Sequence, residues 1–440
     1  MKTRANGRIA AAASTILIAL APPAGAQTAA SPVALQTPAM AGWIESWGTA
    51  QPLGPVPPPP AFARPAPSRN AAPTPPSPIV PVPPTLADQT VRMIVRASVG
   101  GPQVRLVFRN AAGGPTVTLG AIHAALAQPD GGISTASDRV VTFGGRRSVT
   151  MFPGATIVSD PIPLAVAPLA DVAVSIHLPA ATPTNTVHPL GLNPAYIAAG
   201  DQTAATTLTA PQTVRSYFWL SGLSVPAAAA DAGTIVAFGD SITDGYATTP
   251  GAHRAWPELL AARLQAEGGG RLGVVNMGIS GNRILKMGAG ESALQRFDSD
   301  VLARPGVRWV LLLEGINDIN MSIIPGVPAS EGVTAAQIIA GLDQLITRAH
   351  QHGIRIAGAT ILPTKGLPFY SAAGEAMRGA VNAWIRGSGR FDAVVDFDAA
   401  VRDPADPLRL RPSFDPGDHV HPNDAGNAAM ARAIPPTLFR

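Results

Sequence analysis

The 440-residue chain contains no cysteine, which excludes disulfides, thiolate metal sites and cysteine nucleophiles. Charged residues make up only 14% of the chain and apolar residues 46%, so the chain is not intrinsically disordered and has ample material for a core. The formal net charge of +4 falls to about +1 without the three basic residues among the first eight positions. The composition therefore gives no argument for a nucleic-acid partner.

Beyond the N-terminus, no segment is apolar for long enough to span a membrane, because Gly, Pro or a charge interrupts each one. The N-terminus itself has basic residues, an apolar stretch over residues 9–21 and an Ala-Gly-Ala site before Gln27, which is typical of a cleaved export signal. A membrane anchor is the alternative, but 13 residues rise only about 20 Å as a helix. We expect residues 1–26 to be a signal peptide, and the mature protein to be secreted or periplasmic without stable membrane insertion.

Proline is concentrated in one stretch, with 15 prolines among the 33 residues from Pro52 to Pro84. Proline has no N–H and a fixed φ, so residues 51–85 are predicted to be an irregular linker or loop. This stretch is either a stiff spacer, which we favour, or a ligand for a proline-recognising module. Before it, residues 27–50 contain the alternating run W-I-E-S-W-G-T at 43–49, which predicts a strand.

Short alternating runs punctuated by Gly, Pro, Asn and Asp follow the proline-rich stretch. They show no helical period, so residues 86–228 are predicted to form a β-sandwich domain, to which the earlier strand contributes from across the loop. The main runs are 90–98, 103–109, 116–122, 140–143, 148–152, 172–177 and 217–220, and Gly100-Gly101 marks a turn between the first two.

From residue 229 the chain alternates between apolar runs and helix-like segments. The expected strands are 234–238, 272–277, 307–313, 354–359 and 393–397. The expected helices are 255–267, 294–302, 334–352, 374–386 and 423–434. This alternation predicts an α/β domain over 229–440, with a parallel sheet covered on both faces. Ligands of such sheets sit at the carboxyl ends of the strands, so the polar residues that follow the strands are the candidate site.

Three polar blocks follow these strands and contain Ser241, Gly281 and Asn317, and a fourth block, just before the last helix, contains the pair Asp418 and His421. A serine on a Gly-flanked strand-to-helix turn is exposed beside backbone N–H groups that can face an oxyanion. Gly281 lets a backbone N–H approach a ligand, and Asn317 adds a carboxamide donor. Asp418 can orient the imidazole of His421, which can then take the proton of Ser241.

The four blocks, in this order in the C-terminal half, resemble the SGNH or GDSL hydrolase superfamily. The resemblance implies an SGNH-type, flavodoxin-like three-layer fold with Ser241 as nucleophile, His421 as general base and Asp418 as its orienting partner. It also implies an oxyanion hole made by the N–H groups of Ser241 and Gly281 and the side chain of Asn317. The N-terminal part is similar to secreted bacterial arylesterases and xylan-associated acylhydrolases, in which a β-rich domain beginning near a W-x-x-x-W-G-T run precedes the hydrolase.

Some residues in and near these blocks allow other roles. A general α/β-hydrolase would need G-x-S-x-G, which is absent at both Ser241 and Ser280, and Ser280 is interpreted as a loop hydroxyl. Asp240 is interpreted as a brace for the serine turn, with a second catalytic acid as the alternative. Trp256 is expected to pack near the mouth of the site, with a role in lining a substrate pocket as the alternative.

The acid–imidazole cluster that precedes the last helix has side chains that could bind a metal ion. One short loop rarely presents so many side chains inward with the geometry that zinc requires, so we expect no metal and no cofactor. The cluster consists of Asp415, Asp418, His419, His421 and Asp424. The histidines outside the blocks are interpreted as structural or solvent-facing, and they are His123, His177, His188, His253, His350 and His352.

Together these features predict a secreted serine esterase that transfers an acyl group to water. The expected substrates are short-chain acyl, carbohydrate or aryl esters. A lipase or lysophospholipase acting on lipid esters is the alternative, and a non-catalytic glycan-binding protein is less favoured. A histidine base must be neutral, so activity is expected to fall as the pH drops through the ordinary histidine pKa of about 6.5. The sequence gives neither the acyl length, the natural alcohol nor the oligomeric state.

Overall fold

The computed structural model of the protein describes residues 42–52, 80–268 and 270–439. The expected signal peptide and most of the expected proline-rich stretch lie outside these residues. Within the described part of the chain, no helix is long and apolar enough to cross a membrane.

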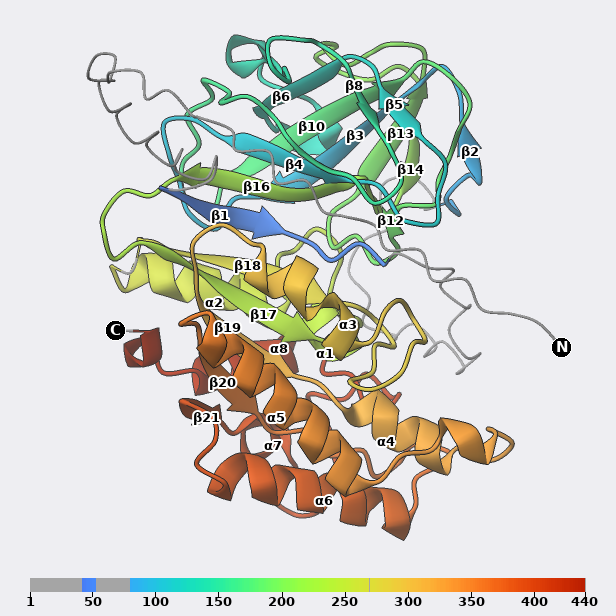
Figure 1. The fold of residues 1–440 in the computed structure, drawn as a ribbon, viewed down its shortest axis with the longest axis vertical. Helices are drawn as coiled ribbons and strands as arrows, with labels where there is room; N and C mark the ends of the chain where they lie inside the picture. The colour runs from blue at the N-terminus through green and yellow to red at the C-terminus, as the bar shows by residue number, and fades with distance from the viewer. Residues whose placement is uncertain (1–41, 53–79, 269, 440) are drawn as a thin grey trace, which may run out of the picture. The chain divides into compact units, whose positions relative to one another are not determined.

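Two antiparallel sheets make up the β-rich region (Figure 1). One has six strands in the order β14-β13-β3-β10-β6-β7, namely Gln212–Val214, Ala195–Ala199, Gln89–Arg96, Asp171–Leu178, Ile122–Leu126 and Arg139–Val140. The other has four strands in the order β1-β16-β4-β9, namely Trp43–Gly48, Leu220–Pro226, Arg105–Arg109 and Thr156–Val158. Apolar side chains of both sheets, including Met93 and Phe108, form a common core.

Three two-stranded sheets complete this region among the described residues. They pair β2 (Thr85–Leu86) with β11 (Thr182–Pro183), β5 (Val117–Leu119) with β8 (Val149–Met151), and β12 (Val187–His188) with β15 (Tyr217–Phe218).

The two runs on either side of Gly100-Gly101 become β3 and β4, but these strands do not pair with each other. β3 pairs with β10 and β13, whereas β4 pairs with β16 and β9. The turn therefore carries the chain from one sheet to the other. The run 116–122 is divided between β5 and β6, and the run 217–220 covers β15 but only the first residue of β16. Six further strands lie outside the predicted runs, namely β2, β9, β11, β12, β13 and β14.

Strand β1 lies between the β-rich region and the parallel sheet (Figure 1). It pairs with β16 and packs against β18 (Leu272–Gly278) of the parallel sheet. Gly273 permits this approach, because a Cβ there would lie 2.0 Å from the carbonyl oxygen of Glu45. Both faces of β1 are covered, and Glu45 and Ser46 are fully buried despite being polar.

The parallel sheet has the order β18-β17-β19-β20-β21, which is the flavodoxin-like 2-1-3-4-5 arrangement. Its other strands are β17 (Gly233–Gly239), β19 (Val307–Leu313), β20 (Arg355–Ala359) and β21 (Ala393–Val395), and every pairing is parallel. The predicted fold class, a three-layer α/β sheet preceded by a β-rich sandwich, is confirmed.

Two groups of helices pack on this sheet (Figure 1). One group is α2 (Trp256–Ala266), α7 (Phe397–Val401) and α8 (Asp424–Ala433). The other is α3 (Ala293–Phe297), α4 (Ile316–Ile323), α5 (Ala335–Gln351) and α6 (Ala372–Gly387). In chain order, the connection from β17 to β18 runs toward one edge of the sheet, whereas the connections from β18 to β19, β20 and β21 run toward the other edge. Because such crossovers are right-handed, the two directions place the two groups of helices on opposite faces of the sheet.

Most predicted strands and helices of this region agree with the structure within two residues. The predicted helix 294–302 is instead α3 followed by a π-helical turn, η3 (Asp298–Leu302). The predicted strand 393–397 ends at Val395, since Phe397 already begins α7. Helix α4 was not anticipated, although it begins within the third polar block.

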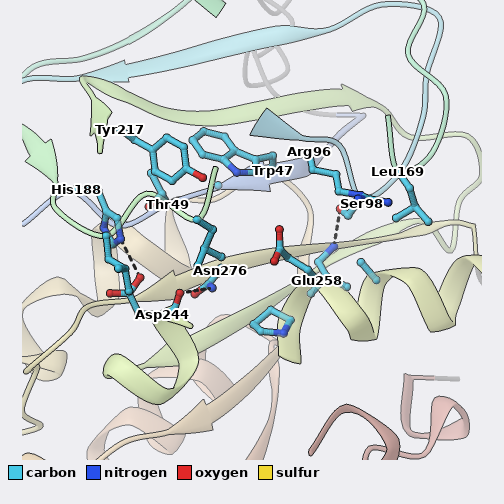
Figure 2. Close-up of a pocket in the computed structure, with 16 residues that line it drawn as sticks. Trp47, Thr49, Arg96, Ser98, Leu169, His188, Tyr217, Asp244, Glu258 and Asn276 are labelled. Atoms are coloured by element: carbon cyan, nitrogen blue, oxygen red, sulfur yellow. Dashed lines mark hydrogen bonds and ion pairs between the residues drawn. The ribbon is translucent and has the colours of Figure 1, made fainter. Parts of the chain in front are cut away.

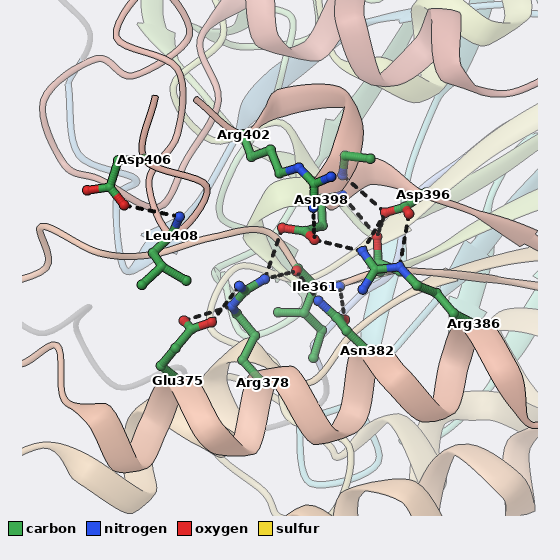
Figure 3. Close-up of polar contacts among 12 residues, drawn as sticks. Ile361, Glu375, Arg378, Asn382, Arg386, Asp396, Asp398, Arg402, Asp406 and Leu408 are labelled. Carbon is green, nitrogen blue, oxygen red and sulfur yellow. Dashed lines mark hydrogen bonds and ion pairs between the residues drawn. The ribbon is translucent and has the colours of Figure 1, made fainter. Parts of the chain in front are cut away.

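A network of buried and half-buried charges fixes α6 to the end of β20 and to α7 (Figure 3). Arg378 donates to the Ile361 carbonyl over 2.9 Å and to Asp398 over 3.0 Å. Arg386 forms a two-point contact with Asp396 over 2.8 and 2.9 Å. Burial opposes ionisation of Asp396, but the Arg386 contact prevails and lowers the pKa of this carboxyl to about 2. These contacts hold the carboxyl end of β20 in place.

Candidate active site

The candidate serine lies where β17 ends and the short helix α1 (Ser241–Asp244) begins. Asp240 caps this helix, because its carboxylate accepts the N–H of Ile242 over 2.9 Å. The brace role expected of Asp240 is therefore present. Ser241 is the first helical residue, and the first N–H groups of a helix have no acceptor within it. The turn thus offers a hydroxyl and a backbone donor at one point.

The two residues expected to serve Ser241 lie beside it. The Ser241 hydroxyl donates to Nε2 of His421 over 2.8 Å, and Nδ1 of the same ring donates to Asp418 over 2.8 Å. The other oxygen of Asp418 accepts the N–H groups of Val420 and His421 over 3.0 and 2.9 Å. Burial opposes ionisation of Asp418, but the contacts with His421 prevail and lower the pKa of this carboxyl. The arrangement lets His421 receive a proton from Ser241 while Asp418 stabilises the resulting imidazolium.

Helix α8 fixes the loop that carries His421. Asn427, in the first turns of α8, donates to the Pro422 carbonyl over 2.7 Å and accepts the N–H of Trp256 over 3.0 Å. Trp256 is fully buried and packs edge-on against Phe397. Trp256 is thus a core residue that anchors α2 to α8, so the packing role holds and the pocket-lining role does not.

Gly281 and Asn317 are linked through Asn282, which follows Gly281 in the chain. Gly281 has φ of +82°, a conformation that glycine adopts without strain, and sits in a turn closed by the N–H of Asn282 donating to the Ile279 carbonyl over 2.9 Å. The Asn317 carboxamide donates to the Asn282 carbonyl over 2.9 Å. The two expected oxyanion donors therefore belong to adjoining, hydrogen-bonded segments at the carboxyl ends of β18 and β19.

The sequence analysis missed a buried arginine that ties these segments together. Arg296, which is 1% exposed, donates to the carbonyl of Gly239, the last residue of β17, over 2.8 Å and to that of Met277, near the end of β18, over 2.7 Å. Its Nε donates to the side chain of Asn282 over 2.9 Å, and its guanidinium lies over the ring of Phe238. A single arginine on a predicted helix gave no signal of this role.

Buried carboxyl groups lie close to the candidate oxyanion donors. Burial raises the pKa of Asp240 to about 7 and that of Asp318 to about 6. Burial also raises the pKa of Glu314 well above its ordinary value, and the nearby Asp240 carboxyl adds to the effect. Burial thus disfavours the ionised form of all three carboxyl groups.

The other members of the acid–imidazole cluster have partners of their own. His419 contacts Asp415 over 2.6 Å, and Asp424 accepts both donors of Thr249 over 2.8 and 2.7 Å. Within the described ranges, no group of three or more potential metal ligands converges. A further residue that the sequence analysis missed is Tyr246, whose half-exposed ring lies 4.4 Å from that of His421, between centroids.

A histidine of the β-rich region also reaches α1, at the end away from Ser241. His188 contacts Asp244 over 2.9 Å (Figure 2). The sequence analysis placed His188 among the structural or solvent-facing histidines. The structure buries it at the contact with the parallel-sheet region, and no local motif announces that position.

The comparisons with known proteins agree with the motifs. Residues 237–429 match the model of the GDSL-like lipase/acylhydrolase family, so the resemblance stated from the four blocks is confirmed. No curated protein sequence matches the chain.

Several solved structures are similar to the C-terminal part. One is a putative lipolytic protein of the G-D-S-L family from Desulfitobacterium hafniense, at 22% identity, 46% coverage of this chain, 99% of that chain and a TM-score of 0.34. Another is the acetylxylan esterase Axe2 of Geobacillus stearothermophilus, which shares 26% identity over 46% of this chain and 91% of that chain, with a TM-score of 0.37. A GDSL-like lipase from Bacteroides thetaiotaomicron shares 18% identity over 49% of this chain and 91% of that chain, with a TM-score of 0.36.

Proposed function

We propose that this chain, a carboxylic ester hydrolase whose residues 237–429 belong to the GDSL-like lipase/acylhydrolase family, works through a serine triad. Ser241 is the nucleophile, His421 the general base and Asp418 the carboxylate that orients His421. The observation that carries the proposal is the continuous hydrogen-bonded path from the Ser241 hydroxyl through both nitrogens of His421 to Asp418.

The proposed reaction is acyl transfer to water in two halves. Ser241 attacks the ester carbonyl while His421 takes its proton, and the N–H groups of Ser241 and Gly281 with the Asn317 carboxamide stabilise the oxyanion. His421 then protonates the leaving alcohol, and the acyl group stays on Ser241 as an ester. Water attacks this ester with His421 again as base, which releases the acid and restores the Ser241 hydroxyl.

The experiment that tests the proposal compares the wild type with Ser241→Ala. We expect wild type to hydrolyse p-nitrophenyl acetate and Ser241→Ala to lose turnover by a factor on the order of 10⁴ or more. A fluorophosphonate probe should label the wild type alone. Labelling that persists in Ser241→Ala would place the nucleophile elsewhere.

We propose short-chain acyl esters of carbohydrates or aryl alcohols as substrates. The half-exposed Tyr246 ring beside His421 supports this, since a flat aromatic surface suits a sugar or aryl leaving group. Lipid esters are the second candidate, supported by the lipase and acylhydrolase membership of the family. A rate series with p-nitrophenyl esters from acetate to palmitate, with acetylated xylan alongside, separates the two. Rates that increase toward palmitate would favour the lipid substrate.

We also propose that the protein is exported and that its mature form begins at Gln27. The basic, apolar and Ala-Gly-Ala segments of residues 1–26 support this. N-terminal sequencing of protein recovered from the periplasm and the medium tests it, and a sequence beginning at Met1 would contradict it.

A further inference from the structure

Helix α1 is held at its second end by a residue of the β-rich region. Asp244, the last residue of α1, is 3% exposed and contacts Nε2 of His188 over 2.9 Å. The other carboxylate oxygen of Asp244 accepts the N–H of Ser280 over 2.9 Å and its hydroxyl over 2.6 Å. Ser280 directly precedes Gly281. A single carboxylate therefore links His188 to the residue that precedes one proposed oxyanion donor.

The surroundings of His188 require its imidazole to carry two protons. Its Nδ1 faces the carbonyl oxygen of Ala50 at 2.7 Å, and its Nε2 faces the Asp244 carboxylate, so both neighbours are acceptors. Burial lowers the pKa of His188, but the Asp244 carboxylate and the Ala50 carbonyl outweigh burial and raise it, with Arg296 opposing. The two acceptors thus favour a protonated His188 opposite Asp244, with both side chains less than 5% exposed.

The contact lies at the edge of a small cavity between the β-rich region and the parallel sheet (Figure 2). The cavity has a volume of about 50 Å³ and is lined by His188, Tyr217, Asp244 and Asn276, among others. The Tyr217 ring is stacked beside that of His188, with 6.1 Å between centroids. Asn276 donates to the Thr243 carbonyl over 2.8 Å and so supports the same end of α1. The imidazole is therefore held in one orientation.

The turn around Gly281 is held from its other side by Arg296 and Asn317. Asn282 accepts Arg296 on its side chain and Asn317 on its carbonyl, both over 2.9 Å. The Ser280 side is linked to the β-rich region through Asp244 to His188, and the Asn282 side is linked to it through Arg296 and Asp300 to Arg109. Loss of the His188 contact would leave Asp244 free to turn away from Ser280 and let the Gly281 peptide shift.

We propose that His188 is a positioning residue, through which the β-rich region fixes Asp244, Ser280 and the Gly281 N–H for oxyanion stabilisation. This inference rests on the proposed function of Ser241, Gly281 and Asn317. It assigns the β-rich region a role in the reaction itself. A displacement near 1 Å at a reacting group can reduce rate by about 10²-fold, so a tight support of this kind has a measurable effect.

The test uses two substitutions that each keep one half of the histidine contacts. The amide of His188→Gln can donate where Nε2 does, toward Asp244, whereas that of His188→Asn donates where Nδ1 does, toward Ala50. The kcat for p-nitrophenyl acetate is calculated from the concentration of sites that react with a fluorophosphonate. Unfolded molecules therefore do not enter the value. We expect His188→Asn to lower kcat about 10- to 100-fold with KM changed less than about 3-fold, and His188→Gln to recover most of the loss.

The matched control is His123→Asn, which breaks another histidine–aspartate pair of the β-rich region, with Asp138 at 2.9 Å. Its kcat should equal that of the wild type. A wild-type kcat per titrated site in His188→Asn, even with lower stability, would overturn the positioning role. Turnover retained in Ser241→Ala would instead overturn the proposed function, so the two failures are distinguishable. If neither His188 variant gives titratable protein, Ser280→Ala replaces them, and an unchanged kcat there would overturn the inference.

Discussion

Helix α1 has a histidine–aspartate pair at each end, and the two pairs differ in what the histidine faces. At the first end, His421 lies between the Asp418 carboxylate and the Ser241 hydroxyl, so one ring nitrogen meets a group that can give up a proton. At the second end, His188 lies between a carboxylate and a carbonyl, so both nitrogens must donate. Similar residues at similar distances thus supply a base in one place and, in the other, an imidazole whose two nitrogens both face acceptors. The difference comes from the group that each ring faces besides its aspartate, which is the Ser241 hydroxyl for His421 and the Ala50 carbonyl for His188.

The comparison extends to the regions around the two pairs. We call the carboxyl ends of the parallel strands, with Ser241, Gly281, Asn317 and His421, the rim. We call the contact between the β-rich region and the parallel sheet the interface. Substitutions at the rim should change rate with little effect on folding, whereas those at the interface should change the free energy of unfolding. We propose that His188 is an exception: it lies at the interface, but its substitution should change the rate because it positions residues of the rim.

The largest effect is expected at the rim, from His421→Asn. Without the imidazole, Ser241 has no base, so kcat for p-nitrophenyl acetate should fall by a factor on the order of 10⁴ or more. The matched control is His419→Asn, in the same loop, where the histidine pairs with Asp415 and does not face Ser241. It should keep the wild-type kcat within about 2-fold. Comparable losses in both variants would mean that the loop, rather than the His421 base, was disturbed.

The next effect is expected at the interface, from Arg304→Met. Arg304 contacts the fully buried Glu45 over 3.1 Å, and removal of one partner of a buried ion pair costs about 3–5 kcal/mol. Burial already raises the pKa of Glu45 to about 7, despite Arg304, so the folded state binds a proton more tightly than the unfolded chain does.

The cost of Arg304→Met should therefore depend on pH. It should be largest above about pH 7, where Glu45 must ionise, and smaller near pH 5, where Glu45 can stay protonated. Urea denaturation at pH 5 and pH 8 measures both values. Adding Glu45→Gln to Arg304→Met should restore part of the stability at pH 8. Equal losses at the two pH values would exclude Glu45 as the source of the cost.

A smaller effect is expected at the rim from Asn317→Ala. Loss of one oxyanion donor typically lowers kcat by about 10²- to 10³-fold. The midpoint of urea denaturation should change little, because Asn317 is partly exposed and donates one hydrogen bond, to the Asn282 carbonyl. A wild-type kcat in Asn317→Ala would remove this side chain from the mechanism.

The smallest effect is expected from a second histidine at the interface. His253 contacts Glu258 over 3.0 Å and Asp171 of the β-rich region over 3.5 Å. Burial lowers its pKa, but these carboxylates prevail and raise it from 6.5 to about 9. The pKa is raised in the folded state, so the stabilisation is fully present below about pH 6.5 and is lost as the pH rises through about 9.

The free energy of unfolding of the wild type should thus decrease by on the order of 1–3 kcal/mol between pH 6.5 and 9. His253→Asn should flatten this dependence. Asparagine is suitable because His253 has φ of +54°, which asparagine tolerates better than most residues. An unchanged slope in His253→Asn would show that other groups are responsible. Urea denaturation across the pH range provides the measurement.

The parallel sheet and the rim could be predicted largely from sequence. Each strand of that sheet is a short apolar run, and Ser241, Gly281 and Asn317 follow strands, so the geometry of parallel sheets places them at the same edge. His421 does not follow a strand but precedes the last helix, α8. Helix α4 was missed, since its first residues are the third polar block and that block was interpreted as a strand end alone.

The interface could not be predicted, because its contacts join residues far apart in the chain. Glu45 and Arg304 are separated by 259 positions, and His188 and Asp244 lie in regions with different sequence patterns. In β1, the alternation of W-I-E-S-W-G indicates a strand with one exposed face. The structure covers both faces, and Glu45 is buried where the alternation gave no indication of a partner.

The position of β1 has a consequence for the order of assembly. This strand is synthesised first among the described elements, yet its neighbours β16 and β18 are made some 180 and 230 residues later. Pairing over so long a separation is slow, so we expect β1 to join its neighbours late in folding. Its docking completes the layer between the two regions, and with it the Ala50 carbonyl reaches His188. We therefore expect the contact between the two regions to be complete only after β1, the first of the described strands to be synthesised, has docked.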